Sequence, residues 1–160
     1  MYPASSEGLN KETEKAVYFF TPAFHPLDSF SAHAVTIWNV TFPTAEHAYH
    51  WKKFSDSYPE IANEILAAKS PEMAQQIAHA NKIKQPASWH QIKVGIMEQI
   101  FQAKAEQNKD VQEILKRTGQ REIIENTPIG SSDDFWGAGV DSKGQNMVGK
   151  IWMKIRDSYY

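Results

Sequence analysis

The stretch "FPTAEHAYHWKKF" at positions 42–54 marks a change in the chain from strand to helix. Just before it, "AVTIWNVTF" (34–42) alternates apolar and polar residues, which predicts two short strands with a turn near Asn39. Pro43 stops this run, and Thr44 is a residue type that caps helix N-termini well. The stretch therefore predicts a helix over residues 45–56.

This predicted helix carries more polar groups than a core helix needs and more aromatic area than a surface helix needs. Glu46, His50 and Lys53 are spaced i, i+4, i+7, so they share one face. A carboxylate, an imidazole and an ammonium on one face form either a salt-bridged surface or the wall of a polar pocket. Aromatic neighbours favour the pocket, because their rings would shield it: Phe42, Tyr49 and Phe54.

Two other uses of nearby polar residues fit the sequence less well. His47 and His50 are three residues apart, which differs from the i, i+4 spacing of the two histidines in a zinc-protease helix. The segment "FHPLDSF" contains a histidine, an aspartate and a serine, but no nucleophile elbow surrounds Ser29. We therefore expect neither a metal site nor a serine nucleophile.

The rest of the chain predicts a few strands and many helices. Further strands are expected at 16–20 and 121–126, and further helices at 59–69, 71–81, 88–108, 109–119 and 146–160. Ser70 and Ser88 are expected to cap helix N-termini, and Gly119 is expected to end a helix. Because strands and helices do not alternate regularly, this order predicts an α+β fold that is mostly helical with a small β-sheet.

Length and composition are those of an ordinary soluble globular protein. The chain has 160 residues, which fits a single domain over 16–160, preceded by a flexible segment at 1–15. Its net charge of −2 provides no basic surplus for nucleic acid, and it has no cysteine for disulfides or thiolate chemistry. Without a signal-peptide pattern or an apolar run of roughly 20 residues, we expect a cytoplasmic protein.

Residues 127–145 form a long, glycine-rich segment with no apolar period. Loops of this size are usually functional or disordered. One interpretation is a flexible acidic loop with Trp136 folded back into the core. The other is a loop whose backbone comes close to a sugar or phosphate, with Trp136 stacking on a ring. Composition alone slightly favours the acidic loop.

Several of these segments together resemble the YbiA-like family, also called the NADAR family. They are "LDSFSAH", "FPTAEHAYHWKKF" and "DDFWGAG" followed by "GQN", and the resemblance runs from about Val17 to Arg156. The order and spacing of the segments make it specific. The matching residues are Phe30 in the first segment, Pro43, Thr44, Glu46, His47, Lys53 and Phe54 in the second, and Asp133, Trp136, Gly137, Gly139, Gly144, Asn146 and Gly149 in the last.

The chain departs from the family pattern in three places, one of which is the loop between Pro128 and Asp133, a few residues longer than in bacterial relatives. Leu27, Asp28 and Ser29 replace a phenylalanine, a serine and an asparagine of the first motif. His50 stands where a glutamine is common. We expect these changes to affect the choice of substrate more than the fold.

The resemblance implies a YbiA-like α+β fold and an N-glycosidase. Such an enzyme would split the ribose–nitrogen bond of a phosphorylated ribosyl-amine or nucleotide, such as an early intermediate of riboflavin biosynthesis. Two alternatives remain: a hydrolase that removes ADP-ribose from guanine bases in nucleic acid, and a non-catalytic module that binds ADP-ribose or NAD. The expected partner is a small ribose-phosphate or ADP-ribose compound, or ADP-ribosylated nucleic acid, with no metal and no cofactor.

Breaking an N-glycosidic bond builds positive charge on the sugar, which calls for carboxylates. Glu46 is expected to stabilise the cation or activate water, or else to act as a covalent nucleophile. Asp133 is expected to hold sugar hydroxyls or assist the leaving group. His47 or His50 could donate a proton, Lys53 would pair with phosphate and Trp136 would stack on the base. The expected substrate-binding residues are Phe30, His47, His50, Lys53, Trp136, Gly137, Gly139 and Asn146.

Overall fold

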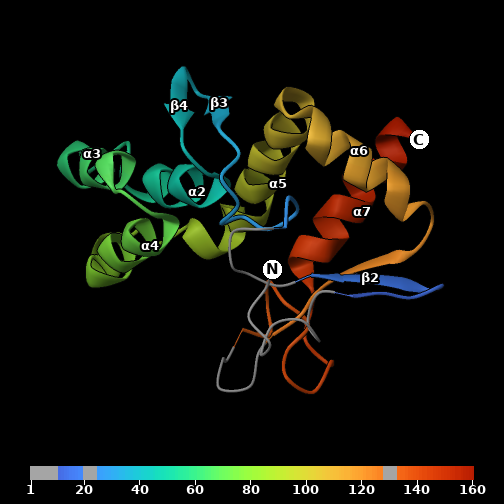
Figure 1. The fold of residues 1–160 in the computed structure, drawn as a ribbon. Coiled ribbons are helices and arrows are strands. Elements are labelled where there is room, and N and C mark those ends of the chain that lie inside the picture. Colours follow the sequence, from blue (N-terminus) through green and yellow to red (C-terminus); the bar gives the residue numbers. More distant parts are fainter. Residues whose placement is uncertain (1–10, 20–24, 128–132) are drawn as a thin grey trace. The chain divides into compact units, whose positions relative to one another are not determined.

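The computed structural model describes residues 11–19, 25–127 and 133–160 (Figure 1). It divides into two compact units. The terminal unit contains Met1–Ser31 and Lys109–Tyr160, and the central unit contains Ala32–Asn108. The described residues form six α-helices, one 3₁₀ helix and five short strands. The expected α+β class, mostly helical with little sheet, is confirmed.

The terminal unit holds a three-stranded sheet whose strands come from both ends of the chain. These strands are β1 (Lys11–Glu12), β2 (Ala16–Phe19) and β5 (Glu122–Glu125). Strand β2 lies in the middle, antiparallel to β1 and parallel to β5, with Val17 opposite Ile123. Both of these residues are buried, as expected for the core face of a sheet. Part of the segment expected to be flexible therefore pairs as β1.

Two helices complete the terminal unit: α6 (Lys109–Thr118) and α7 (Met147–Tyr159). Helix α7 packs against both α6 and β5. It buries an apolar stripe spaced three and four residues apart, made of Val148, Ile151, Trp152 and Ile155. Helix α6 ends where expected, because Gly119 adopts a left-handed conformation with φ of 62° that other residues adopt only with strain.

The central unit begins with a hairpin and continues as a group of helices. Its elements are β3 (Val35–Ile37), β4 (Val40–Phe42), α2 (Ala45–Phe54), α3 (Pro59–Ala67), α4 (Pro71–Ala80), the 3₁₀ helix η1 (Lys82–Lys84) and α5 (Trp89–Gln107). The hairpin turns at Trp38 and Asn39, which both have positive φ, as a two-residue turn requires. The turn predicted near Asn39 is confirmed.

Two helices of the central unit start at the capping residues expected from the sequence, and a third does not. Thr44 and Ser70 accept hydrogen bonds from the backbone N–H groups of His47 and Met73 and cap α2 and α4 as expected. The expectation that Ser88 caps α5 is wrong. Its own backbone is helical, with φ of −79° and ψ of −3°, so its side chain makes no capping hydrogen bond.

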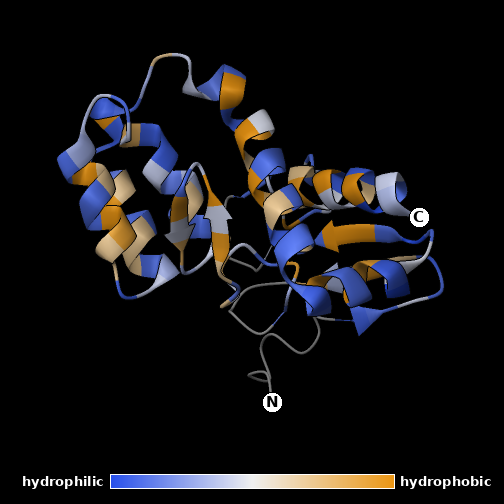
Figure 2. Ribbon diagram, turned by 90° about the horizontal axis from the view of Figure 1, so that it is seen from above, coloured by the Kyte–Doolittle hydropathy of each residue, from blue (hydrophilic) through white to orange (hydrophobic). Residues whose placement is uncertain are grey.

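An apolar cluster packs α2, α3 and α4 of the central unit together. Its buried members are Phe54, Ile61, Ala62, Ile65, Ala74 and Ala78. Figure 2 shows hydrophobic and hydrophilic residues interspersed along the helices. Helix α2 also packs against α5, so it is enclosed by three helices. This position explains why its polar side chains are buried.

The domain boundaries expected from the sequence stay a prediction. The first ten residues, Phe20 at the end of the expected strand 16–20 and residues 128–132 of the glycine-rich segment lie outside the described residues. No helix among the described residues is long and apolar enough to cross a bilayer.

Candidate active site

Helix α2 carries Glu46, His50 and Lys53 on one face, and the first two of these side chains are buried. Glu46 is 6% exposed and His50 is 3% exposed, although both belong to residue types that usually face water. Burying such groups costs free energy unless they find partners. The hydrogen-bond partners of Glu46 and His50 therefore determine which chemistry these side chains can support.

Glu46, His50 and Lys53 form a chain of hydrogen bonds along the helix. The Nε2 atom of His50 lies 2.6 Å from Oε1 of Glu46, and Nδ1 of His50 lies 3.1 Å from Nζ of Lys53. An ionised carboxylate can only accept, so Nε2 carries a hydrogen and donates it to Glu46. Nδ1 then accepts from the Lys53 ammonium. The three side chains that the spacing places on one face are thus joined by hydrogen bonds.

His47 has a different environment from His50. It is 1% exposed, with Nδ1 at 2.8 Å from Oγ1 of Thr44 and Nε2 at 3.0 Å from the carbonyl oxygen of Ala68. The carbonyl can only accept, so Nε2–H donates to it and Nδ1 accepts from the hydroxyl of Thr44. Both ring nitrogens are thus used within the protein. This arrangement favours a structural role, in which His47 ties the start of α2 to the end of α3, over a role in substrate binding.

Lys53 lies among aromatic rings and other cations. Its Nζ is 5.0 Å from the ring centre of Tyr49 and 5.8 Å from that of Trp89. Burial lowers the pKa of Lys53 to about 8, Glu46 opposes this, and the nearby Lys93 and Lys82 lower it further. Lys53 can therefore gain or lose a proton close to neutral pH.

The aromatic neighbours of Lys53 are themselves held in place. Trp89 donates a hydrogen bond of 3.2 Å from Nε1 to the hydroxyl oxygen of Tyr49. Burial raises the pKa of Tyr49 well above its usual range, so this residue remains an uncharged phenol. The two rings form a fixed apolar wall beside the ammonium of Lys53.

A pocket of 380 Å³ opens beside this wall in the central unit. Its lining includes Tyr49 and Lys53 of α2, together with residues from α4, η1, the segment before α5 and the first turns of α5: Ala78, His79, Lys82, Gln85, Trp89, His90 and Lys93. Of these residues, Lys53 was expected from the sequence to bind substrate and Tyr49 to shield a pocket. Lys93 follows Trp89 by four residues, and this spacing was the available signal that the two share a helix face.

The terminal unit holds the other group of expected site residues. Oδ1 of Asp133 accepts a hydrogen bond of 3.0 Å from the backbone N–H of Trp136, which shapes the turn between them. Trp136 is half-buried and meets Phe135 edge to face at 4.9 Å. It is therefore neither sealed in the core nor fully exposed, and both residues keep the roles proposed below.

Gly137 and Gly139 lie close to Thr127, which follows the end of β5. A side chain at Gly137 would begin 2.6 Å from Oγ1 of Thr127, which is too close for any other residue. Thr127 also donates a 2.7 Å hydrogen bond to the carbonyl oxygen of Asp133 and accepts one of 2.9 Å from the N–H of Gly139. These contacts favour a structural role for Gly137 and Gly139 over direct contact with substrate.

Asn146 binds a strand of its own unit. Its side-chain amide accepts a hydrogen bond of 2.9 Å from the N–H of Glu125 and donates one of 2.9 Å to the carbonyl oxygen of Ile123. The side chain thus continues the hydrogen-bonding edge of β5. Gly149 follows one turn later, where any side chain would collide with that same carbonyl oxygen. This geometry favours a structural role for Asn146 and Gly149.

The first expected motif is a tight turn. Phe30 is half-buried, and its N–H donates a 2.8 Å hydrogen bond to Oδ1 of Asp28. The carbonyl oxygen of Leu27 accepts a 2.8 Å hydrogen bond from Nε1 of Trp152 on α7. The residues that depart from the family pattern therefore still form a buried, hydrogen-bonded turn.

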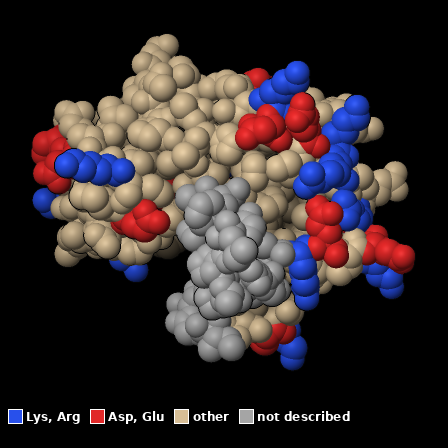
Figure 3. All heavy atoms as spheres, in the orientation of Figure 1, with Lys and Arg blue, Asp and Glu red and all other residues tan. Residues whose placement is uncertain are grey.

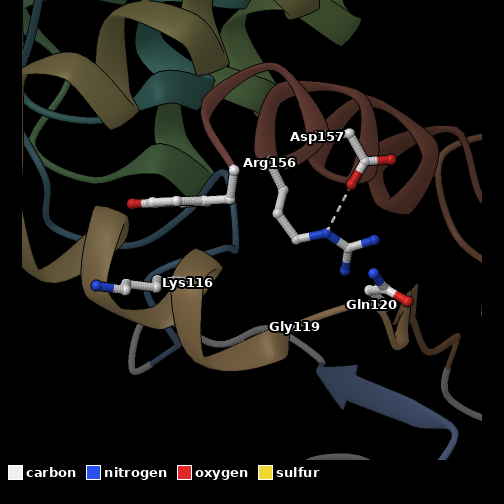
Figure 4. Close-up of a pocket in the computed structure, with 6 residues that line it drawn as sticks. Lys116, Gly119, Gln120, Arg156 and Asp157 are labelled. Atoms are coloured by element: carbon white, nitrogen blue, oxygen red, sulfur yellow. Dashed lines mark hydrogen bonds and ion pairs between the residues drawn. The ribbon is translucent and has the colours of Figure 1, made fainter.

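A second pocket, of 540 Å³, lies beside Arg156 in the terminal unit (Figure 4). Arg156 donates from Nη1 to the carbonyl oxygen of Arg121 at 2.6 Å and to Oγ1 of Thr118 at 3.2 Å. Its Nε lies 3.1 Å from Oδ1 of Asp157, the pair joined by the dashed line in Figure 4. Arg156 thereby ties the end of α7 to the turn after α6, so we assign this pocket no part in the reaction.

Within residues 11–19, 25–127 and 133–160, no group of three or more His, Asp or Glu side chains is arranged to hold a metal ion. The predicted site residues fall into two sets. Glu46, His47, His50 and Lys53 belong to the central unit, whereas Phe30, Asp133, Trp136, Gly137, Gly139 and Asn146 belong to the terminal unit.

Comparison with known proteins identifies the family. The NADAR domain model matches residues 10–159, which is nearly the whole chain. This chain belongs to the NADAR domain family. The resemblance seen in the sequence motifs is thereby confirmed.

Relatives of this NADAR protein carry names that agree with one another. It is 31% identical over 144 residues to an N-glycosidase of Nostoc punctiforme, covering 88% of this chain and 90% of the relative. It is 26% identical over 140 residues to the N-glycosidase YbiA of Escherichia coli, covering 88% and 84%. A riboflavin biosynthesis protein of Vibrio vulnificus is 30% identical over 146 residues, which span 90% of this chain but 38% of that protein.

The fold also matches a solved structure. The NMR structure of E. coli YbiA superposes with a TM-score of 0.79, covering 97% of this NADAR protein and 90% of YbiA at 24% identity. The match confirms the expected YbiA-like fold.

Proposed function

We propose that this NADAR protein is an N-glycosidase that hydrolyses the bond between ribose and nitrogen in a phosphorylated ribosyl-amine or nucleotide. The enzyme class rests on the family and on the N-glycosidases it resembles. The observation that carries the proposal here is the buried chain from Glu46 through His50 to Lys53. Burying a carboxylate lowers the stability of the folded protein. Buried ionisable groups with charged partners are enriched at functional sites.

The name of the Vibrio relative supports an early riboflavin-pathway intermediate as the substrate. Such compounds join a ribose 5-phosphate to a pyrimidine through a nitrogen. The pocket beside Lys53 has the size and charge for a small phosphorylated sugar. The proposed partner is therefore this class of small molecule.

The reaction needs one carboxylate where positive charge develops. As the carbon–nitrogen bond breaks, its electron pair leaves with the nitrogen and the anomeric carbon becomes cationic. A water oxygen then bonds to that carbon and its proton passes to Glu46, which returns it to solvent, while the leaving nitrogen takes up a proton from Asp133 or from solvent. Because His50 fixes Oε1 of Glu46, the carboxylate is pre-oriented for this step.

Other side chains have supporting roles in the proposal. His50 orients Glu46 and links it to Lys53, whose pKa of about 8 suits proton exchange near neutral pH. Asp133 is proposed to hold sugar hydroxyls or assist the leaving group. Trp136 and Phe30 are proposed to contact the base, since each is only half-buried.

An ADP-ribosylated base in nucleic acid is the second substrate class for this chemistry. On the face shown in Figure 3, Lys and Arg side chains lie next to Asp and Glu side chains rather than forming a broad basic surface. Together with the net charge of −2, this mixture disfavours tight binding of a nucleic acid duplex.

The absence of cysteine fits a reducing compartment, which supports the cytoplasmic location we propose.

The test is an incubation of wild-type protein and Glu46→Gln with the ribosylaminopyrimidine phosphates of the riboflavin pathway and with ADP-ribosylated guanine DNA. Release of ribose 5-phosphate by wild type alone is the expected result. Release of ADP-ribose alone would show that the substrate is instead an ADP-ribosylated base in nucleic acid. No release from either, with tight binding of ADP-ribose in calorimetry, would refute the proposed activity in favour of a binding module.

A further inference from the structure

The pocket of the central unit is lined by basic side chains, and Glu46 is a carboxylate whose charge acts to raise the pKa of one of them, Lys53. Three lysines line it, Lys53, Lys82 and Lys93, together with His79 and His90. None of the described residues lining it is acidic. Like charges gathered in one place repel, and an anionic ligand would relieve that repulsion. The pocket is thus arranged for an anion.

The basic side chains of the pocket influence one another. Lys93 and Lys82 both add to the lowering of the pKa of Lys53. Partial burial, together with His50 and Lys53, lowers the pKa of His79. Such mutual effects require short distances, so the charges act on a common space rather than on separate surfaces.

The charges come from three segments that fold against each other. Lys53 is on α2, Lys82 is in η1 directly after α4, and Lys93 is in the second turn of α5. Helix α2 packs against both α4 and α5, which brings these segments together (Figure 1). The positive end of the helix dipole of α5 adds potential of the same sign.

The pocket also has a wall for a sugar and a suitable size. The rings of Tyr49 and Trp89 line it next to Lys53. Its 380 Å³ lies near the lower end of the range for small-molecule sites, roughly 300–1,000 Å³. A phosphate with its attached sugar matches this space and this chemistry.

We propose that this pocket binds a phosphate group of the substrate and that Lys82 and Lys93 supply most of the charge for it. The inference rests on the proposed function, because it concerns the same substrate. Ribose 5-phosphate and the diphosphate of ADP-ribose share the required chemistry. Binding here would hold the substrate beside the hydrogen-bonded chain of Lys53, His50 and Glu46.

The direct test is calorimetry with ribose 5-phosphate and with ADP-ribose on wild type, Lys82→Gln, Lys93→Gln and the double variant. Each single change is expected to weaken binding about tenfold, as loss of a charged contact does, and the double change more. Lys84→Gln is the matched control, because Lys84 belongs to the same 3₁₀ helix but lies 5.4 Å from the ring of Tyr58 and outside the pocket lining.

The two ligands identify the source of the phosphate. A loss confined to ribose 5-phosphate supports a monophosphate site, and a loss confined to ADP-ribose supports a diphosphate site. Unchanged affinity of the double variant for both ligands overturns the proposal. Circular dichroism establishes that the variants are folded, which we expect because Lys82 is exposed and Lys93 is half-buried.

Kinetics separate this inference from the proposed function. The double variant is expected to raise KM for the phosphorylated substrate while leaving kcat and the hydrolysis of a phosphate-free analogue nearly unchanged. Wild-type KM in an active double variant refutes the phosphate pocket but not the N-glycosidase. A wild-type protein that hydrolyses nothing, yet binds ribose 5-phosphate through Lys82 and Lys93, refutes the N-glycosidase but not the pocket.

Discussion

Glu46 is the side chain on which the proposed reaction depends most directly. Glu46→Gln keeps its shape and removes its charge, so hydrolysis should fall by about 10²–10⁴-fold while the protein remains folded. The rate of ribose 5-phosphate release measures this. Glu60→Gln, on the exposed first turn of α3, is the control and should keep wild-type activity. Full activity of Glu46→Gln would rule out the assigned role.

His50 is proposed to orient Glu46 and to connect it with Lys53. His50→Leu leaves the buried Glu46 and the half-buried Lys53 without this partner, which should destabilise the protein by about 1–3 kcal/mol and lower kcat. His50→Gln can donate to Glu46 and accept from Lys53, so it should recover most of the stability.

The two His50 variants are compared by urea unfolding and by the pH dependence of kcat. If His50 also relays protons, His50→Gln will be stable but will have an altered pH profile, since an amide does not titrate near neutrality. Equal stability of His50→Leu and wild type would contradict the bridging role.

Lys53 should impose a stability cost that depends on pH. Its pKa is about 8 in the folded protein, against an ordinary value of 10.5. Between these values the unfolded chain binds more protons, so stability rises with pH across this window, and the cost is fully present below pH 8. Lys53→Met should therefore be more stable than wild type at pH 7, by on the order of 1–2 kcal/mol.

That advantage should shrink as the pH rises from about 8 towards 10.5. Urea unfolding of both proteins at pH 7 and near pH 10 measures the difference. Lys69→Met, at an exposed position, should show no such dependence. An advantage of Lys53→Met that stays constant over this range would mean that the pKa of Lys53 is not lowered.

Among the elements, α7 and β5 show why small residues recur in the last motif. Gly149 lets α7 approach β5 so closely that a side chain would overlap the carbonyl oxygen of Ile123 and the amide of Asn146. Gly149→Ala should therefore destabilise the protein by about 3 kcal/mol or more. Thermal unfolding measures the loss.

Gly95 provides the matched control, since it lies in α5 and a side chain there would meet nothing within 4 Å. Gly95→Ala should stabilise the protein by about 0.5–1 kcal/mol through reduced backbone freedom in the unfolded chain. Similar effects of the two substitutions would contradict the close packing of α7 on β5.

In the chain as a whole, the terminal unit depends on strands from both ends of the sequence. Removal of residues 1–19 deletes β1 and β2 and exposes Ile123, which is fully buried. This truncated protein should lose cooperative unfolding of the terminal unit, as followed by circular dichroism. A cooperative wild-type transition after the deletion would contradict the sheet order.

Much of the local structure could be predicted from the sequence. Thr44, Ser70 and Gly119 mark helix ends through contacts within a single turn, so no distant residue is needed to place them. The shared face of Glu46, His50 and Lys53 follows from helix geometry in the same way. Each of these features depends on neighbours close in sequence, and residue type and spacing therefore determine it.

Other features required the tertiary structure. The parallel pairing of β2 with β5, the hydrogen bonds of Asn146 to β5, and the carbonyl partner of His47 all join segments far apart in the chain. The basic pocket likewise takes its side chains from several elements. Periodicity and capping describe only local geometry. Which polar groups are buried together, and which pKa values shift as a result, depends on how the helices and strands pack.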